Sequence, residues 1–441
     1  MLQFIWFEIK RNLKRKEVIF LTLILVLCEV ALLMQCNTNS HYEDVFSLQE
    51  KRQNLFYNNY PIIDKEKNEE IDQKVLQLNK TFAEYTSQKR KHQWKEMLTS
   101  LLDMYIFEEE MSYYSLPKEY RDSLPNVEEV KDIVKKMDLF DGSKYEPYML
   151  QLDWMGEYYT KLSYHAEALK MRYLYSIYDQ DIGVLSYSSV NSSTLLIQLM
   201  RSVLAVVLPL LVAILFFDDH KYYHEIGVDK SMMVIPKVRR TFIISKIIAN
   251  SALVLFVVFV PILLMACILG IFDHFQYHSY PTVVNEGGII GTAVSYVRDG
   301  GYLLRDSEEL YLGVTRMSEN MFSNPNIDLI PMWAVNVLGM AMIIFLIIFY
   351  VQINLFCTRL FKNSYVALLC NLLIIAVLVY YAPVESIDAL RCLNPMIYKD
   401  PFLNIMGTSY YPWLTGMLVI GGYNILLYIA NRILFRFKYY G

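Results

Sequence analysis

Two ionisable residues interrupt otherwise apolar segments, and their side chains are the ones best placed for ion chemistry. Glu29 lies within residues 18–36, and Arg201 lies within residues 196–217. Charges inside a membrane usually face a protein interior or form pairs. With a helical rise of about 1.5 Å per residue, both side chains come to a similar depth in the outer half of the membrane. The sequence therefore predicts a Glu29–Arg201 ion pair. The alternative is that Arg201 extends outward while Glu29 is protonated or solvated in a cavity.

Other residues with catalytic or metal-binding potential form no recognisable site. His220 and His224 have i,i+4 spacing but no evident third ligand, and Glu108–Glu109 lies outside the apolar segments. The chain has no G-x-x-x-x-G-K-[ST] loop for ATP, no H-E-x-x-H motif, no C-x-x-C pair and no G-x-S-x-G elbow. We therefore expect a non-catalytic chain with no cofactor or metal of its own. An intramembrane enzyme would have no motif to support it.

These residues must be positioned by membrane helices. The chain has 441 residues, of which 54% are hydrophobic and 20% charged, more apolar than one soluble core can absorb. A membrane helix needs about 20 mostly apolar residues, and six segments meet this requirement. The predicted fold is an all-α polytopic membrane protein with six transmembrane helices. They are residues 18–36, 196–217, 242–271, 332–356, 365–382 and 413–435.

The segments between these helices differ in charge, and this difference predicts the orientation. Lysine and arginine concentrate in residues 1–17, 218–241, 357–364 and 436–441, whereas residues 272–331 hold few. Short basic segments stay in the cytoplasm, so both termini are expected there, in a bacterial plasma membrane. Residues 1–17 are predicted to form an amphipathic helix in the inner headgroup layer. A secretory signal is the alternative, although aromatic residues precede the basic stretch.

Residues 37–195 are long enough to form an external domain, predicted to be mainly helical. Residues 64–113 contain no Gly or Pro, and apolar residues recur there and in residues 145–177 at three- and four-residue steps. This aromatic stripe is interpreted as helix packing, with a substrate-facing surface as the alternative. No cysteine lies between residues 37 and 194, so disulfides do not stabilise this domain. Residues 272–331 remain unassigned, and residues 383–412 are expected to fold against the membrane surface.

The connector at residues 218–241 carries the clearest motif. Glu225 begins a turn, Gly227 relieves a bend, and Pro236 ends the short amphipathic stretch before it. Its apolar ridge consists of Met232, Met233 and Val234. A short, stiff connector of this kind suits docking into a groove on a cytoplasmic partner.

This connector resembles that of the membrane subunits of bacterial ABC transporters of the type 2 exporter class. The family shows E-x-G-T, a short apolar helix, P-x-x-R and a later lysine; this chain has Glu225-x-Gly227, Pro236, Arg239 and Lys246 at matching spacings, with Val228 in place of the threonine. The resemblance implies a coupling helix that contacts a separate ATPase subunit, which binds ATP and Mg. It also implies a dimer with a second permease subunit, identical or different. The ATPase-coupling residues would be Glu225, Gly227, Met232, Met233, Val234, Pro236 and Arg239.

The expected function is therefore that of a transmembrane permease subunit of an ATP-driven exporter. Peptides, lipids or other amphiphilic molecules would be its substrates, and an ATPase, a second permease subunit and the bilayer its partners, with no role for nucleic acid. The alternative is a membrane-bound sensor or immunity receptor, whose external helical domain binds a ligand without transport.

Overall fold

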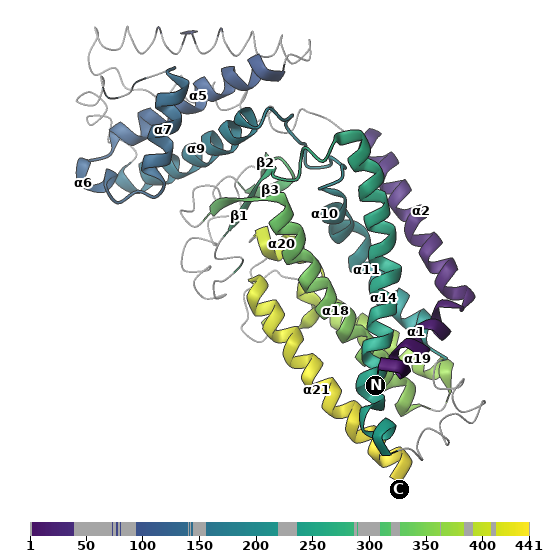
Figure 1. Cartoon of the computed structure of the whole chain (residues 1–441). Coiled ribbons are helices and arrows are strands. Elements are labelled where there is room, and N and C mark those ends of the chain that lie inside the picture. Colours follow the sequence, from purple (N-terminus) through teal and green to yellow (C-terminus); the bar gives the residue numbers. More distant parts are fainter. Residues whose placement is uncertain are drawn as a thin grey trace.

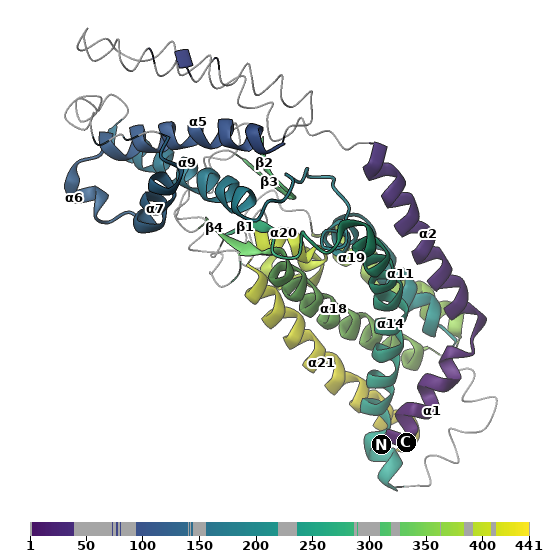
Figure 2. The same cartoon turned by 45° about the horizontal axis from the view of Figure 1, so that its top comes forward.

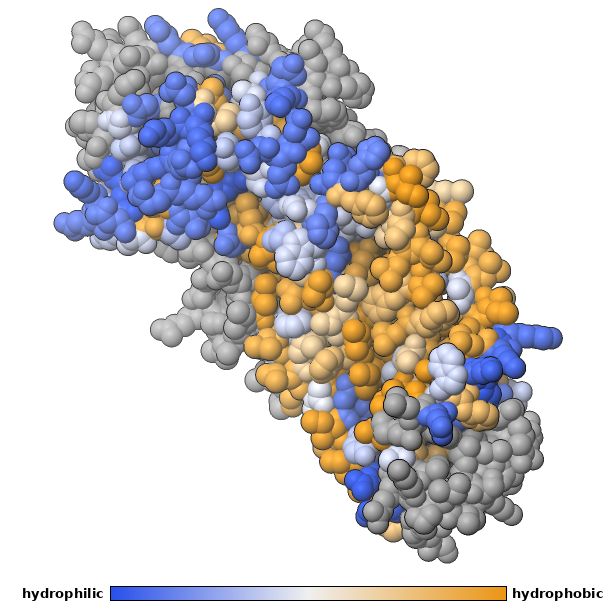
Figure 3. Space-filling view, viewed as in Figure 1, coloured by the Kyte–Doolittle hydropathy of each residue, from blue (hydrophilic) through white to orange (hydrophobic). Residues whose placement is uncertain are grey.

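The computed structural model describes most of the chain. The described ranges are residues 2–38, 94–139, 156–218, 236–285, 309–318, 327–361, 363–382, 391–406 and 412–440, with a few isolated positions between them. They form an elongated molecule with a helical bundle at one end and a smaller helical domain at the other (Figure 1). The visible surface of the bundle is apolar over most of its length, whereas that of the helical domain is hydrophilic (Figure 3).

Among the described residues, five helices of the bundle are long and apolar enough to cross a membrane. A sixth, α19 (Ser364–Tyr380), has 17 residues and would be about 25 Å long at about 1.5 Å per residue. The chain is thus a helical membrane protein, and α19 is a shorter helix than the predicted segment 365–382 suggested. The five long helices are α2 (Lys16–Thr38), the continuous segment α10–η2–α11 (Leu195–Phe216), α14 (Pro236–Asp273), α18 (Met332–Leu360) and α21 (Trp413–Tyr440).

Helix α18 occupies the centre of the bundle and contacts α11, α14, α19 and α21. Amide side chains join it to α21. Gln352 Nε2 donates to Asn424 Oδ1 at 3.0 Å, and Asn431 Nδ2 donates to the Gln352 carbonyl at 3.1 Å. Asn424 Nδ2 in turn donates to the Phe345 carbonyl at 3.2 Å. This row of hydrogen bonds pairs the side-chain N–H groups of Gln352, Asn424 and Asn431, which would be costly to leave unpaired in lipid.

Helices α2 and α21 lie on opposite flanks of the bundle, and both ends of the chain lie at the end away from the helical domain (Figures 1 and 2). The placement of both termini on one side of a membrane stays a prediction. Which side of the membrane that is stays a prediction from the charge pattern.

The helical domain consists of α5 (Trp94–Ser115), α6 (Lys118–Arg121), α7 (Val127–Met137) and α9 (Gly156–Asp179). Helices α5 and α9 pack against each other extensively. Leu98, Leu101, Met104 and Tyr105 of the predicted stripe are all buried. The interpretation of the stripe as helix packing is thus confirmed for α5. The position of this domain outside the membrane remains a prediction.

Two small sheets, which the sequence did not predict, lie between the helical domain and the bundle. Strands β1 (Pro281–Asn285) and β4 (Ile327–Pro331) pair antiparallel, and β2 (Glu309–Leu312) forms a hairpin with β3 (Thr315–Ser318). The described part of the chain is mainly helical, consistent with the predicted all-α membrane fold, and all four strands lie in residues 272–331, which the sequence left unassigned. The hairpin turns at Gly313, where φ is +58° and a Cβ atom would lie 2.8 Å from the Tyr173 hydroxyl, so this position requires glycine.

The sheets attach the helical domain to the bundle. The Tyr173 hydroxyl of α9 hydrogen-bonds to the Tyr280 hydroxyl, which also accepts from the Leu185 backbone N–H at 3.0 Å. Arg172 of α9 forms a 2.9 Å ion pair with Asp328 of β4. These polar contacts fix the orientation of α9 on β1 and β4.

Candidate functional site

A polar network lies at the end of the bundle that holds both termini. It begins on α1 (Leu2–Leu13), which packs on α14. Glu8 and Asn12, one turn apart, are completely buried, whereas Trp6 and Phe7 are exposed. The face of α1 that contacts the protein therefore carries the polar residues Glu8 and Asn12 beside the apolar Ile5, a feature that the prediction of an interfacial amphipathic helix did not include.

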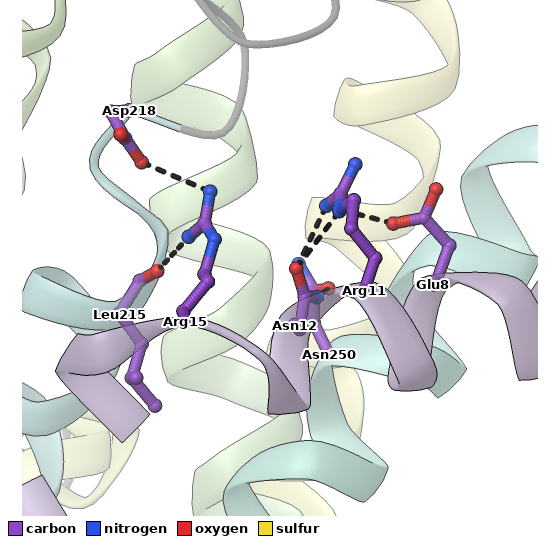
Figure 4. A network of polar contacts seen from close by, with 7 residues as sticks. All are labelled: Glu8, Arg11, Asn12, Arg15, Leu215, Asp218 and Asn250. Carbon is purple, nitrogen blue, oxygen red and sulfur yellow. Dashed lines mark hydrogen bonds and ion pairs between the residues drawn. The ribbon is translucent and has the colours of Figure 1, made fainter. Parts of the chain in front are cut away.

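The buried part of this network connects α1 to α14 (Figure 4). Arg11 Nη2 lies 2.9 Å from Glu8 Oε2 and 2.9 Å from Asn12 Oδ1. Asn12 Nδ2 donates to Asn250 Oδ1 of α14 at 3.4 Å. Charge-assisted hydrogen bonds are stronger than neutral ones, so Arg11 fixes the side-chain positions of Glu8 and Asn12. Asn12 then connects these side chains to α14.

Arg15, just beyond α1, connects the network to the second membrane helix (Figure 4). Its Nη1 donates to the Leu215 carbonyl at 2.6 Å, and its Nη2 lies 3.2 Å from Asp218 Oδ1. Leu215 lies in the last turn of α11, where carbonyl groups lack helical partners and a cation is favourable. Asp218 is the first residue of the predicted coupling connector. Arg15 thus holds the end of α11 and the start of the connector together.

Most of the predicted coupling residues lie outside the described part of the chain, namely Glu225, Gly227, Met232, Met233 and Val234. Pro236 is the first residue of α14, and Arg239 follows in its first turn. Helix α14 therefore begins six residues before residue 242, because proline is pre-organised for the first position of a helix. Its part that could cross a membrane begins at Thr241, next to the predicted start.

Aromatic contacts hold the part of α14 that follows the connector. Lys246 is buried, with its Nζ 5.8 Å from the centroid of the Phe242 ring. Phe242 stacks on Phe435 of α21 with centroids 5.6 Å apart, and Arg359 of α18 lies over the other ring at 5.6 Å. Helices α14, α18 and α21 therefore meet at these side chains, and Lys246 lies one helical turn before Asn250.

The predicted Glu29–Arg201 ion pair is not formed. The Arg201 guanidinium lies between the rings of Tyr187 at 4.0 Å and Phe402 at 4.3 Å. It donates to the carbonyls of Tyr187 at 3.1 Å and of Val314. Both carboxylate oxygens of Glu29 lack a hydrogen-bond partner among the described residues. Arg201 belongs to a π-helical turn, η2 (Met200–Leu204), whose extra residue changes the direction of the side chains.

Asp400 lies close enough to Arg201 for the positive charge of Arg201 to affect its pKa. Burial raises the pKa of Asp400 to about 6, although Arg201 and backbone donors lower it. These donors are the N–H groups of Phe402 at 3.1 Å and Leu403 at 3.4 Å, in the first turn of α20 (Pro401–Met406). The cost of desolvating the carboxylate thus exceeds the gain from its partners.

We expect the Asp400→Asn variant to be more stable than the wild type at neutral pH. The folded carboxyl binds its proton more tightly than the ordinary value of 3.8 implies, so its stabilising contribution is complete below about pH 4 and is lost as the pH rises through about 6. The asparagine avoids this loss, which amounts to about 3 kcal/mol. Thermal unfolding between about pH 4 and about pH 7 measures the difference. The exposed Asp179→Asn change is the control; equal pH profiles for wild type and Asp400→Asn would contradict the prediction.

Comparison with known proteins adds no relative. No family model, curated protein or solved structure matches this chain. The connector sequence and the polar network at its first residue, Asp218, are therefore the features that bear on function. Sequence reasoning missed the roles of Glu8, Asn12, Arg15, Asp218 and Asn250 in that network.

Proposed function

We propose that this chain is the permease subunit of an ATP-driven exporter of the ABC type. It would move a peptide, lipid or other amphiphilic molecule across the membrane, with ATP hydrolysed by a partner subunit. The observation that carries the proposal is the Arg15 bridge to the Leu215 carbonyl and Asp218. It links the start of the connector to α1 and α11, so that a displacement of the connector would also displace these two helices.

The two helices that flank the connector are also joined at their far ends. Helix α14 has 38 residues and is about 57 Å long at about 1.5 Å per residue. Its last residue, Asp273, accepts hydrogen bonds from the Ser192 N–H at 2.7 Å and the Ser192 hydroxyl at 2.9 Å. Ser192 lies just before α10, and Asn336 of α18 donates to the neighbouring Ser193 carbonyl at 2.7 Å.

This double attachment supports a mechanism for coupling. Closure of the partner ATPase on ATP would displace the connector. Helices α11 and α14 would then move as one unit, because hydrogen bonds connect them to the same neighbours at both ends. The displacement would reach the sheets and the helical domain through the Tyr173–Tyr280 contact. Rigid-body movement of tied helices is a common way to carry a change across a protein.

The test is co-purification of the full-length chain with its ATPase from native membranes. Replacing Glu225 and the Met232–Val234 ridge with alanine is expected to abolish capture of the ATPase, because the docking surface would be lost. Glu119→Ala, on an exposed residue of the helical domain, is the matched control. The proposal fails if the altered chain still binds and stimulates the ATPase, or if the wild type captures no nucleotide-binding subunit.

A further inference from the structure

Glu29 occupies a position on α2 where an apolar residue would be expected. The buried stripe of this helix consists of Val18, Leu21, Leu25, Glu29 and Leu32, at helical spacing. Glu29 has 0% of its surface exposed, so its carboxyl group points into the bundle and away from lipid. Helix α2 packs against α14 and α11, so the buried stripe with Glu29 lies on the side of α2 that contacts the bundle.

No described residue forms an ion pair with this carboxyl group. Neither oxygen of Glu29 accepts a hydrogen bond from a described residue. The charged groups of the packed helices are engaged elsewhere, since Lys246 lies over Phe242, Asp273 binds Ser192, and Arg201 binds the Tyr187 carbonyl. The remaining ionisable groups on α2 and α14 are Lys16, Glu17, Cys28 and Cys36 on α2 and Lys237, Arg239, Arg240 and Cys267 on α14.

An ionised carboxylate is very costly in such surroundings. Burying an unpaired carboxylate costs far more than burying its neutral form, and the group usually takes up a proton instead. Intramembrane carboxyl groups without a cation partner are also typical of proton sites. We propose that Glu29 is a proton-binding site within the membrane domain, with the carboxyl group neutral at physiological pH.

Proton binding at Glu29 would control the attachment of α2 to the bundle. Helix α2 lies at the edge of the bundle (Figure 2), and most of its apolar side chains outside the buried stripe are exposed, among them Ile19, Phe20, Leu23 and Leu27. Loss of the proton would leave a negative charge next to α14 and α11. This charge would weaken the packing of the buried stripe of α2 against them. The attachment of α2 would thus depend on pH. This inference does not depend on the proposed transport function.

A hydrophobic carbodiimide tests the protonation state directly. With N,N′-dicyclohexylcarbodiimide, the carboxyl oxygen bonds to the central carbon of the reagent while the carboxyl proton moves to one nitrogen. The acyl group then shifts to the other nitrogen, giving a stable N-acylurea that contains one whole reagent molecule. In liposomes at neutral pH, mass spectrometry should find this adduct on Glu29, less of it at alkaline pH, and none in Glu29→Gln. Glu17, exposed on the same helix, is the internal control.

Stability measurements cover the case in which the reagent cannot reach the site. Glu29→Gln keeps the neutral shape, so its melting temperature should stay close to that of the wild type near neutral pH and exceed it increasingly as the pH rises. Glu29→Lys should lower the melting temperature by about 5 °C or more, while Glu17→Gln should change it little at any pH. The proposal is overturned if Glu29 gives no adduct and Glu29→Gln is less stable than the wild type at neutral pH, because the ionised form would then be native.

Discussion

Replacing Arg201 with alanine is expected to lower the free energy of unfolding by about 3–5 kcal/mol. The change removes the charged donor to the Tyr187 and Val314 carbonyls and the cation between the Tyr187 and Phe402 rings. It also takes away the larger of the two positive charges, Arg201 and Lys399, that act on the buried Asp400 carboxyl group. Unpaired buried groups carry their full desolvation cost. Thermal unfolding of the purified chain measures the loss.

Two further variants make this result specific. Arg201→Lys keeps the charge but has no planar fork to reach both carbonyls and stack between both rings, so we expect an intermediate loss. Lys95→Ala removes an exposed ion pair, since Lys95 and Asp181 are 61% and 77% exposed, and should change stability little. If Arg201→Ala unfolded at the same temperature as Lys95→Ala, the junction between α10–α11, the β2–β3 turn and α20 would not depend on Arg201.

Replacing Arg15 with alanine is expected to reduce stimulation of the partner ATPase by about tenfold or more while leaving the two subunits bound. The connector sequence is unchanged and can still dock. Its first residue, Asp218, and the end of α11 at Leu215 lose their common link to α1. Docking without coupling distinguishes this variant from the Glu225 variant, which should lose docking itself. ATPase assays on the reconstituted complex, with co-purification in parallel, measure both properties.

The neighbouring residues supply controls for this second experiment. Asp218→Asn keeps a hydrogen-bond acceptor for Arg15 and should retain most of the stimulation. Lys10 is exposed on α1, so Lys10→Ala should behave as the wild type. Full stimulation by the Arg15→Ala variant would show that the bridge does not carry the coupling.

The membrane helices were the part of the fold that could be predicted from the sequence. Each depends on a continuous apolar run, which is a local property of the chain. The start of α14 at Pro236 was missed because the charged residues after it hide the beginning of the helix. The pairing of β1 with β4 was missed for another reason. Its partners are separated in the chain by residues 286–326, and no local pattern specifies contacts over that separation.

The directions of the polar side chains could not be predicted from the sequence either. Spacing along a helix predicts depth in the membrane, and it placed Glu29 and Arg201 at similar depths. It does not predict direction when a π-helical turn such as η2 intervenes, and Arg201 points to Tyr187 instead. The polar face of α1 appeared to belong to the headgroup layer. The burial of Glu8 and Asn12 and the contact with Asn250 show that it faces protein. The sequence signal for this contact was Asn250, an asparagine inside an apolar segment.

The amide row between α18 and α21 has a consequence for biosynthesis. Helix α21 is the least apolar of the five long helices, and it is the last to leave the ribosome. Asn424 and Asn431 find their partners on α18, which is made much earlier. Helix α21 should therefore enter the bilayer beside an α18 that is already in place. A chain that stops before Trp413 would expose the Gln352 amide to lipid and become a substrate for membrane quality control.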